Sequence, residues 1–277
     1  MTPKFPISVI VLTFNEEKNI PACLESVDWA EDVIIVDSGS TDRTISAAQS
    51  TRPDVHIFER RFTDFGDQRN WALDNTNPRH EWILFLDADE RCNSKCAQAI
   101  QAAVKNPGAY VGFFLTCKNF FLGRWIKRCT LYPSWQLRLL KKGYVRFQKY
   151  GHGQREIAEG PLGYIYEPYD HFGFSKGVAH WIERHNHYST HEAELILHLR
   201  KEPLCIGELF SRDPVKRRRC LKRLAARLGI LRPIARFVYL YCFRGGILEG
   251  RPGLLYCLLR FAHEVHIIAK LEEMRAN

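Results

Sequence analysis

The chain has 277 residues, 45% hydrophobic and 26% charged, which suffices for one large α/β domain or for a domain with an appendage. No run of about 18 apolar residues is present, which argues against a membrane-spanning helix. The formal net charge of +9 indicates an anionic partner: a phosphorylated ligand, a nucleic acid or a membrane surface.

Positive charge is concentrated toward the C-terminus, with ten Lys or Arg and one Asp between Arg212 and Arg236. The nine cysteines, an odd number without a C-x-x-C pair, indicate a reducing compartment and not a disulfide framework. Residues 1–7 lack the hydrophobic core of a signal peptide. We therefore predict a protein that is made and kept in the cytoplasm.

In the N-terminal third, β-branched apolar runs alternate with helical patterns. The predicted strands cover residues 7–14, 33–37, 55–58 and 82–86. Helices are predicted after Asn19, over 43–50, and from the segment 65–73. This alternation predicts right-handed crossovers and a mostly parallel sheet flanked by helices.

Acidic side chains directly follow the apolar run 82–86, which is predicted to be a strand buried on both faces. On a strand that continued through them, Asp87 and Asp89 would point to the same side. Two hard anionic ligands on one side suit Mg²⁺ or Mn²⁺. The alternative is a solvated strand end before the turn at Asn93.

Polar clusters end three of the predicted strands, at residues 13–16, 37–40 and 87–90. The carboxyl ends of parallel strands meet at one edge of a sheet, where α/β proteins bind ligands, so we expect the three clusters to converge. No G-x-G-x-x-G and no Walker A sequence is present. A nucleotide site here would therefore use acids and a metal, and not a glycine cradle.

The middle of the chain predicts a helix over 94–105, further strands and a long polar helix. The strands are expected over 110–117, 135–140, 144–150 and 162–166, with 144–150 pairing with 135–140 through a turn at Lys142-Gly143. Residues 119–128 are aromatic and basic and are interpreted as a surface loop. Residues 175–201 are predicted to be helical.

Three helices are predicted beyond Pro203, over 216–228, 233–242 and 254–271. The first is basic and amphipathic, with an apolar stripe at Leu221, Leu224 and Leu228. This is either a solvated face or, as we favour, an interfacial helix on anionic lipid.

Four motifs together resemble the family 2 glycosyltransferases, which have a GT-A fold. They are residues 8–16 (SVIVLTFNE), 36–44 (VDSGSTDRT), 68–70 (QRN) and 86–90 (LDADE). This likeness covers about residues 7–105. More loosely, residues 132–139 and 185–193 resemble the branch with the lipopolysaccharide-core β-1,4-glucosyltransferases, which extends the likeness to about residue 195.

The resemblance implies a Rossmann-like GT-A domain over residues 1–202. Its nucleotide-sugar half would cover about 1–105 and its acceptor half about 106–202. Residues 203–277 would form a helical, basic, membrane-associating extension.

The resemblance also implies a site for a nucleoside-diphosphate sugar, usually a UDP-sugar. Thr13 and Asp37 would hold the uracil and ribose, since an Asp can accept a hydrogen bond from uracil N3–H. Arg69 would lie near the base or the diphosphate. Asp87 would contact the ribose and the metal, and Asp89 would be the principal ligand of a Mg²⁺ or Mn²⁺ ion in a DXD motif. The other nucleotide-sugar-binding residues implied are Asn15, Glu16, Ser38 and Ala88.

Family 2 enzymes usually invert the anomeric centre, which requires a general base for the acceptor hydroxyl. The related branch has a His-Glu pair where this chain has residues 152–156 (HGQRE). We choose Glu156 as the base because a carboxylate is already ionised near pH 7, with Asp170 and His152 as alternatives. Glu156 could instead form a surface ion pair with Arg155 or Arg138.

We therefore expect an inverting glycosyltransferase, peripheral on the inner face of the cell membrane. It would move a hexose from a UDP-sugar to a lipid-linked or lipopolysaccharide-type glycan, and no nucleic-acid partner is expected. One alternative is a sugar nucleotidyltransferase, although that class would need a Gly-rich basic loop where this chain has the acidic residues 13–17. Another is a basic membrane- or nucleic-acid-binding module with an inactive nucleotide site, which the intact carboxylates argue against.

Overall fold

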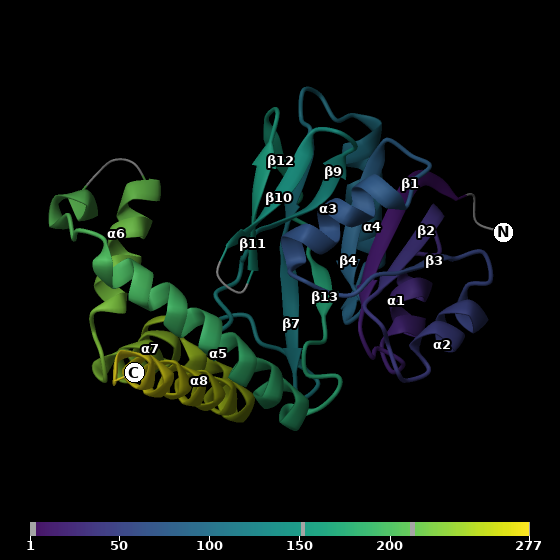
Figure 1. The fold of residues 1–277 in the computed structure, drawn as a ribbon. Coiled ribbons are helices and arrows are strands. Elements are labelled where there is room, and N and C mark those ends of the chain that lie inside the picture. The colour runs from purple at the N-terminus through teal and green to yellow at the C-terminus, as the bar shows by residue number, and fades with distance from the viewer. Residues whose placement is uncertain (1–3, 151–152, 211–213, 277) are drawn as a thin grey trace. The chain divides into compact units, whose positions relative to one another are not determined.

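The structure is a computed structural model that describes residues 4–150, 153–210 and 214–276 (Figure 1). The chain forms two compact units. The N-terminal unit contains the chain up to Trp125 together with Leu131–Lys176, and the C-terminal unit contains Ile126–Thr130 together with the chain from Gly177 onward. This division precedes the residue 202 boundary expected from the sequence, because α5 (Val178–Lys201) packs on α8 (Gly250–Ala276). The functional division at residue 202 stays a prediction.

A seven-stranded sheet in the order β12-β6-β9-β4-β1-β2-β3 forms the centre of the N-terminal unit. Its strands are β1 (Phe5–Thr13), β2 (Ala30–Asp37), β3 (His56–Glu59), β4 (Trp82–Asp87), β6 (Gly112–Leu115), β9 (Gln136–Lys141) and β12 (Leu162–Tyr164). β1 pairs in parallel with both β2 and β4, and β2 pairs in parallel with β3. β9 runs antiparallel between β4 and β6. The predicted α/β class with a mostly parallel sheet is therefore confirmed.

Helices cover both faces of this sheet, because successive residues of a strand point to opposite sides. Val9 and Val11 of β1 pack in one core cluster with α1 (Ile20–Ser26), α2 (Thr44–Thr51) and α4 (Ser94–Lys105). Ile10 packs in a second cluster with α3 (Phe65–Asn75). The strand 82–86 is buried on both faces, as its unbroken apolar run predicts.

A second sheet of four short strands begins where β4 ends. Its order is β5-β13-β7-β8, formed by β5 (Glu90–Arg91), β13 (Tyr169–His171), β7 (Cys117–Phe121) and β8 (Arg124–Trp125). The sequence interpretation of residues 119–128 as a surface loop was therefore wrong. β7 and β8 form a hairpin around Leu122 and Gly123, whose φ angles of 50° and 73° suit a tight two-residue turn.

The strand pairing expected through Lys142-Gly143 was also wrong. β9 takes both of its partners from the central sheet, whereas β10 (Val145–Tyr150) pairs antiparallel with β11 (Gly153–Ala158). The chain turns at Gly143, with φ of 87°, and β10 then packs on α3. The hairpin thereby covers the α3 side of the sheet and does not extend the sheet.

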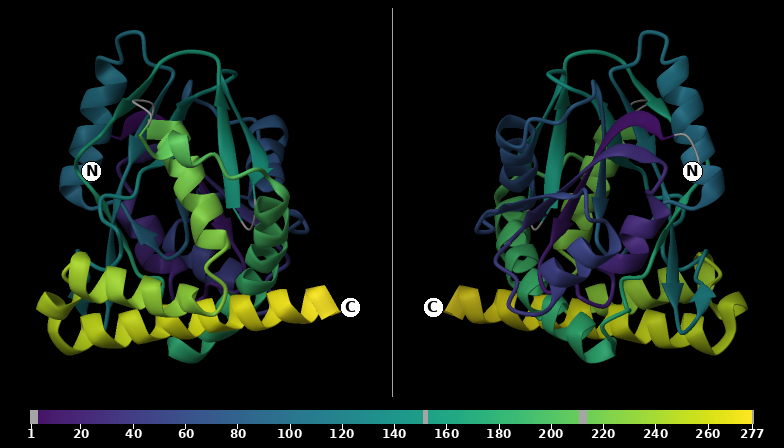
Figure 2. Two further views of the ribbon diagram at one scale, coloured as in Figure 1. Left: turned by 90° about the vertical axis from the view of Figure 1, so that its left-hand side faces the viewer. Right: turned by 90° about the vertical axis from the view of Figure 1, so that its right-hand side faces the viewer.

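The C-terminal unit is helical, as the sequence predicts (Figure 2). Besides α5 and α8 it contains η1 (Ile206–Phe210), α6 (Pro214–Ala226), α7 (Leu231–Val238), the π-helix η2 (Tyr239–Phe243) and η3 (Gly246–Glu249). Ala193 and Ile196 of α5 pack with Ile267 and Leu271 of α8 in its core. Among the described residues, none of the helices combines the length and the apolar character that crossing a bilayer requires.

Candidate active site

The ends of three parallel strands bring the predicted acidic residues to one edge of the central sheet. The register pairs Thr13 of β1 with Asp37 of β2, and Leu12 of β1 with Asp87 of β4. The convergence predicted from the sequence is therefore confirmed.

Asp37 organises the loop that follows β2. One of its carboxylate oxygens accepts from the hydroxyls of Thr13 and Ser40, each at 2.6 Å, and the other accepts from the backbone N–H groups of Gly39 and Ser40 at 3.0 and 2.7 Å. These four donors use the acceptor positions of a carboxylate. A uracil N3–H could reach Asp37 only by displacing one of the two hydroxyls. The Ser38 amide binds the Thr13 carbonyl at 2.9 Å, which ties the loop to β1.

Asn15 and Glu16 fix the loop after β1. Asn15 has a left-handed backbone (φ 54°), and its N–H donates to the Ser40 hydroxyl at 2.8 Å. The Glu16 carboxylate accepts from Lys176 Nζ at 2.6 Å and from the Asn19 amide at 2.7 Å. Burial raises the pKa of Glu16, partly opposed by these two donors. The loops after β1 and β2 thus form one hydrogen-bonded platform at the sheet edge.

Asp87 is held by two arginines. Its two oxygens accept from Arg69 at 3.2 Å and from Arg138 at 2.9 Å, and Arg138 also contacts the carboxylate of Glu90. Burial alone would raise the pKa of Asp87, but the arginine charges hold this pKa below its ordinary value. Arg69 also donates to Gln154 of β11 at 2.7 Å. A buried ion network therefore links β4, α3, β9 and the hairpin.

The Asp89 carboxylate lies beside His171. β4 ends at Asp87 and residues 88–89 form a turn, so the expectation that both aspartates lie on one continuing strand was wrong. Asp89 is 8% exposed, and its Oδ2 lies 3.4 Å from Nε2 of His171. β13 places His171 there, because the strand pairs His171 with Glu90, and the N–H of Phe172, the residue after the strand, donates to the Asp89 carbonyl at 2.8 Å.

The tautomer of His171 follows from its second ring nitrogen. Nδ1 lies 2.7 Å from the side-chain oxygen of Asn119, an acceptor, so Nδ1 carries the hydrogen. Nε2 is then the atom that faces Asp89. A carboxylate oxygen and an imidazole nitrogen at this separation match adjacent ligands of one octahedral cation, which lie about 3 Å apart at ligand distances of about 2.1 Å.

The donor set fits a cation that is shared with a diphosphate. In the part of the chain that is described, no three His, Cys, Asp or Glu side chains gather as a metal site. Asp89 and His171 therefore offer two protein ligands, and Mg²⁺ characteristically completes its shell with water and substrate phosphates. Asp87 fits the ligand role less well than its sequence position indicates, because both its oxygens are engaged by arginines.

The three candidate bases lie in different surroundings. Glu156 is half-buried on β11, on the same face of the strand as Gln154, which contacts Arg69. Asp170 lies on the opposite face of β13 from His171, with Lys118 Nζ 3.9 Å away. Burial raises the pKa of Asp170. His152 lies outside the described residues.

Sequence reasoning missed His171, Arg138, Gln154 and Lys176. The Asp170-His171 pair after a short strand was visible, but nothing in the sequence places it beside Asp89. Arg138 sits in an apolar strand pattern, and a buried arginine there was a signal that a buried acid lies nearby.

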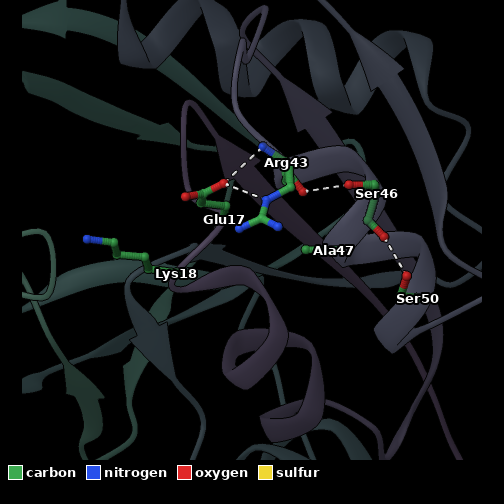
Figure 3. A pocket seen from close by; sticks show the side chains of 6 residues that line it. All are labelled: Glu17, Lys18, Arg43, Ser46, Ala47 and Ser50. Carbon is green, nitrogen blue, oxygen red and sulfur yellow. Dashed lines mark hydrogen bonds and ion pairs between the residues drawn. The ribbon is translucent and has the colours of Figure 1, made fainter.

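A separate pocket of about 410 Å³ lies between the loop after β1 and α2 (Figure 3). Glu17, Lys18, Arg43 and Ser46 are among its lining residues, and Arg43 Nε lies 3.4 Å from the Glu17 carboxylate. Its lining does not include the acids at the strand ends. We therefore place the candidate active site at Asp37, Asp87, Asp89 and His171.

Comparison with known proteins agrees with this geometry. Residues 8–157 match the sequence model of the family described as Glycosyl transferase family 2, and the chain belongs to that family. The resemblance inferred from the sequence motifs is thereby confirmed, and the protein is a glycosyltransferase.

Three relatives illustrate the range of similarity. The lipopolysaccharide core biosynthesis glycosyltransferase LpsC of Rhizobium meliloti is 26% identical over 275 residues, which cover 95% of this chain and 93% of that protein. The glycosyltransferase SunS of Bacillus subtilis is 40% identical over 90 residues, 32% of this chain and 20% of its own. The crystal structure of S. aureus TarS 1–349 covers 98% of this chain and 92% of its own, with 16% identity and a TM-score of 0.46.

Proposed function

We propose that this glycosyltransferase moves a hexose from a UDP-sugar, with inversion, to a lipid-linked or lipopolysaccharide-type glycan. The observation that carries the donor part is the facing of Asp89 and His171 beside the Asp37 platform, at the sheet edge where α/β proteins bind nucleotides. The name of LpsC and the similarity over nearly both full lengths support the acceptor class.

In this proposal, the platform around Thr13, Asn15, Asp37 and Ser38 receives the uridine, and Asp89 with His171 would hold Mg²⁺ or Mn²⁺. A divalent cation supplies Lewis-acid neutralisation of the charge that develops on the departing diphosphate. Arg69 and Arg138 fix Asp87, whose carboxylate presents an oriented acceptor for the ribose.

Glu156 takes the proton of the attacking acceptor hydroxyl in this scheme. Its face of β11 is the face that carries Gln154 and reaches the Asp87 network, whereas Asp170 faces away from His171. Donor binding belongs to about residues 1–105 and acceptor binding to about 106–202. Residues 203–277, with α6 and its exposed Leu221 and Leu224, associate with the inner face of the cell membrane.

The donor site is tested by isothermal titration of UDP with Mn²⁺ into wild type, Asp89→Ala and His171→Ala. We expect each variant to bind UDP at least about tenfold more weakly, since even indirect partners of metal ligands are worth that much. Chelation of the metal should weaken wild type to the level of the variants and change the variants little. Asp28→Ala and His191→Ala, at exposed positions, serve as matched controls and should bind as wild type.

UDP titration together with a transfer assay tests the assignment of Glu156 as the general base. Glu156→Gln should bind UDP as wild type does and lose most of its transfer rate, because general bases contribute about 10²–10⁴-fold. UDP binding that is indifferent to chelation and to Asp89 would overturn the metal assignment. A fully active Glu156→Gln would transfer the role to another group.

A further inference from the structure

Helix α7 turns its aliphatic side chains to solvent. Leu231, Ile234 and Val238 are spaced three and four residues apart, which puts them on one face of the helix, and all three are exposed. A surface helix of a soluble protein ordinarily buries such a stripe and exposes its charges.

The charges of α7 point the other way. Arg232 forms an ion pair with Glu264 of α8, with Nε 2.7 Å from the carboxylate, and Glu264 is buried. Arg236 is also largely removed from water, and this burial lowers its pKa. Figure 1 shows α7 alongside α8, and the ion pair of Arg232 with Glu264 is on the side of α7 that contacts α8. The outward aliphatic face is therefore fixed by an inward ion pair and is not a frayed helix end.

More exposed apolar side chains follow α7 in the chain. Phe243 at the end of η2 is 80% exposed, and Ile247 and Leu248 of η3 are 56% and 70% exposed. We call this the α7–η3 surface, defined by Leu231, Ile234, Val238, Phe243, Ile247 and Leu248. α7 packs on η2 and η2 packs on η3, and exposed apolar side chains concentrated on adjoining elements mark an interaction site.

Charge identifies the partner. Residues 214–248 contain ten Lys or Arg and no Asp or Glu. Arg232 and Arg236 of α7 face α8, so the basic residues that accompany the α7–η3 surface are the eight that precede or follow α7 in this stretch. A second copy of the same surface would bring like charges together, which disfavours self-association. An anionic bilayer offers both an apolar interior for the aliphatic face and negative headgroups for the basic residues.

We propose that the α7–η3 surface lies in the headgroup–acyl boundary of an anionic membrane, with the axis of α7 in the membrane plane. This rests on the membrane association in the proposed function and deepens it, because it assigns insertion to α7–η3 and not to α6. Tyr239, exposed beside Val238, is a residue type that favours the same interface.

The test is sedimentation of the full chain with vesicles of phosphatidylcholine containing about one quarter phosphatidylglycerol. Wild type should be retained, and Ile234→Gln combined with Val238→Gln should lower the vesicle partition coefficient about tenfold or more, because the two aliphatic side chains no longer enter the apolar layer. Both side chains are exposed, so the variant should fold normally, as circular dichroism and thermal unfolding will verify.

Two control double variants distinguish the α7–η3 surface from exposed aliphatic residues on other helices. Leu221→Gln with Leu224→Gln on α6, and Leu258→Gln with Val265→Gln on α8, also replace exposed aliphatic residues and should stay within about twofold of wild type. Loss of retention in the α6 pair and not in the α7 pair would overturn the assignment. So would a wild type that does not bind the vesicles, or a wild type that light scattering shows to be a dimer that only the α7 pair dissociates.

UDP titration of the α7 pair distinguishes the two proposals. UDP should bind the α7 pair as it binds wild type, because the substitutions are in the C-terminal unit. If the α7 pair loses vesicle binding but still binds UDP, the assignment of the α7–η3 surface is supported whether or not the acceptor class is right. If wild type binds vesicles but does not bind UDP, the donor-site proposal has failed and the membrane proposal has not.

Discussion

Arg138 is the residue on which the buried charges of the candidate site depend. It is 3% exposed, and one nitrogen contacts both Asp87, which is partly exposed, and Glu90, which is buried. Burial raises the pKa of Glu90, while the arginine charges keep the pKa of Asp87 low. Without Arg138, two acids would face each other in a site of low polarity.

Arg138→Ala should therefore lower the free energy of unfolding by about 3–5 kcal/mol at pH 7, the cost of leaving a buried charge without its partner. In wild type the lowered pKa of Asp87 keeps its contribution to stability intact down to about pH 4, whereas in Arg138→Ala the acids left without the arginine can be relieved by taking up protons, so the difference from wild type should shrink as the pH falls from 7 toward 4. Urea unfolding at the two pH values measures both effects.

Arg146→Ala provides the control for that substitution. Arg146 makes an ion pair with Asp74 at 2.7 Å, but both side chains are about half exposed. An exposed pair is worth less than about 1 kcal/mol. If both variants lose the same stability, or if the loss in Arg138→Ala does not depend on pH, burial is not the reason that Arg138 matters.

Some residues of the candidate site could be predicted from local sequence patterns, and others could not. Thr13, Asp37 and Asp87 could be predicted to meet, because each ends an apolar run and parallel strands share one edge. His171 could not, because its position beside Asp89 depends on the pairing of two-residue β5 with β13, about 80 residues later in the chain. Sequence separation and short strands leave no periodic signal for such a contact.

At the scale of elements, β6 and β12 can pack closely because residue 163 of β12 is a glycine. A Cβ built on Gly163 of β12 would lie 2.7 Å from the ring of Phe113, which is buried in the core and cannot easily move. Gly163→Ala should lower the free energy of unfolding by about 1–3 kcal/mol, the usual cost of overpacking. Fluorescence-detected urea unfolding measures it.

Gly207→Ala makes the same chemical change where a Cβ meets no atom within 4 Å. Its effect should stay within about 0.5 kcal/mol. Equal effects at the two positions would show that β6 and β12 can separate at little cost, contrary to the tight packing described above.

The elements predicted best are those in the parallel part of the sheet. Their apolar runs are long, and alternation with helices restricts their topology. The antiparallel elements were predicted less well: β9 enters between β4 and β6, and β10 leaves the sheet to pair with β11. The residues of β10 alternate in the same way in either pairing, so the sequence pattern does not discriminate between them.

At the scale of the whole molecule, charge is distributed very unevenly. Residues 126–130 and 177–277 contain 20 Lys or Arg and 10 Asp or Glu, whereas the rest of the chain contains 20 and 21. The net charge of +9 therefore belongs almost entirely to the C-terminal unit. The anionic partner inferred from composition is thus expected at the helices.

Salt should separate the two kinds of binding. Raising NaCl from about 0.05 M to about 0.5 M shortens the screening length severalfold, so retention on anionic vesicles should fall strongly. The affinity for UDP with Mn²⁺ should fall much less, because Asp37 and Asp89, which are proposed to hold the nucleotide and the metal, are buried. Parallel salt curves for vesicle sedimentation and UDP titration would contradict this separation of charge.

The segment Ile126–Thr130 belongs to the C-terminal unit although it interrupts the N-terminal one. Ile126 and Cys129 are buried, the amides of Lys127 and Arg128 bind the Glu249 carboxylate at 3.1 and 2.7 Å, and Cys129 contacts Cys257. During synthesis these apolar residues leave the ribosome 128 positions before Cys257 does. Until Glu249 and Cys257 have been synthesised, the segment Ile126–Thr130 of a nascent chain therefore lacks the partners that it has in the folded protein. A chain truncated after residue 176 would lack these partners permanently.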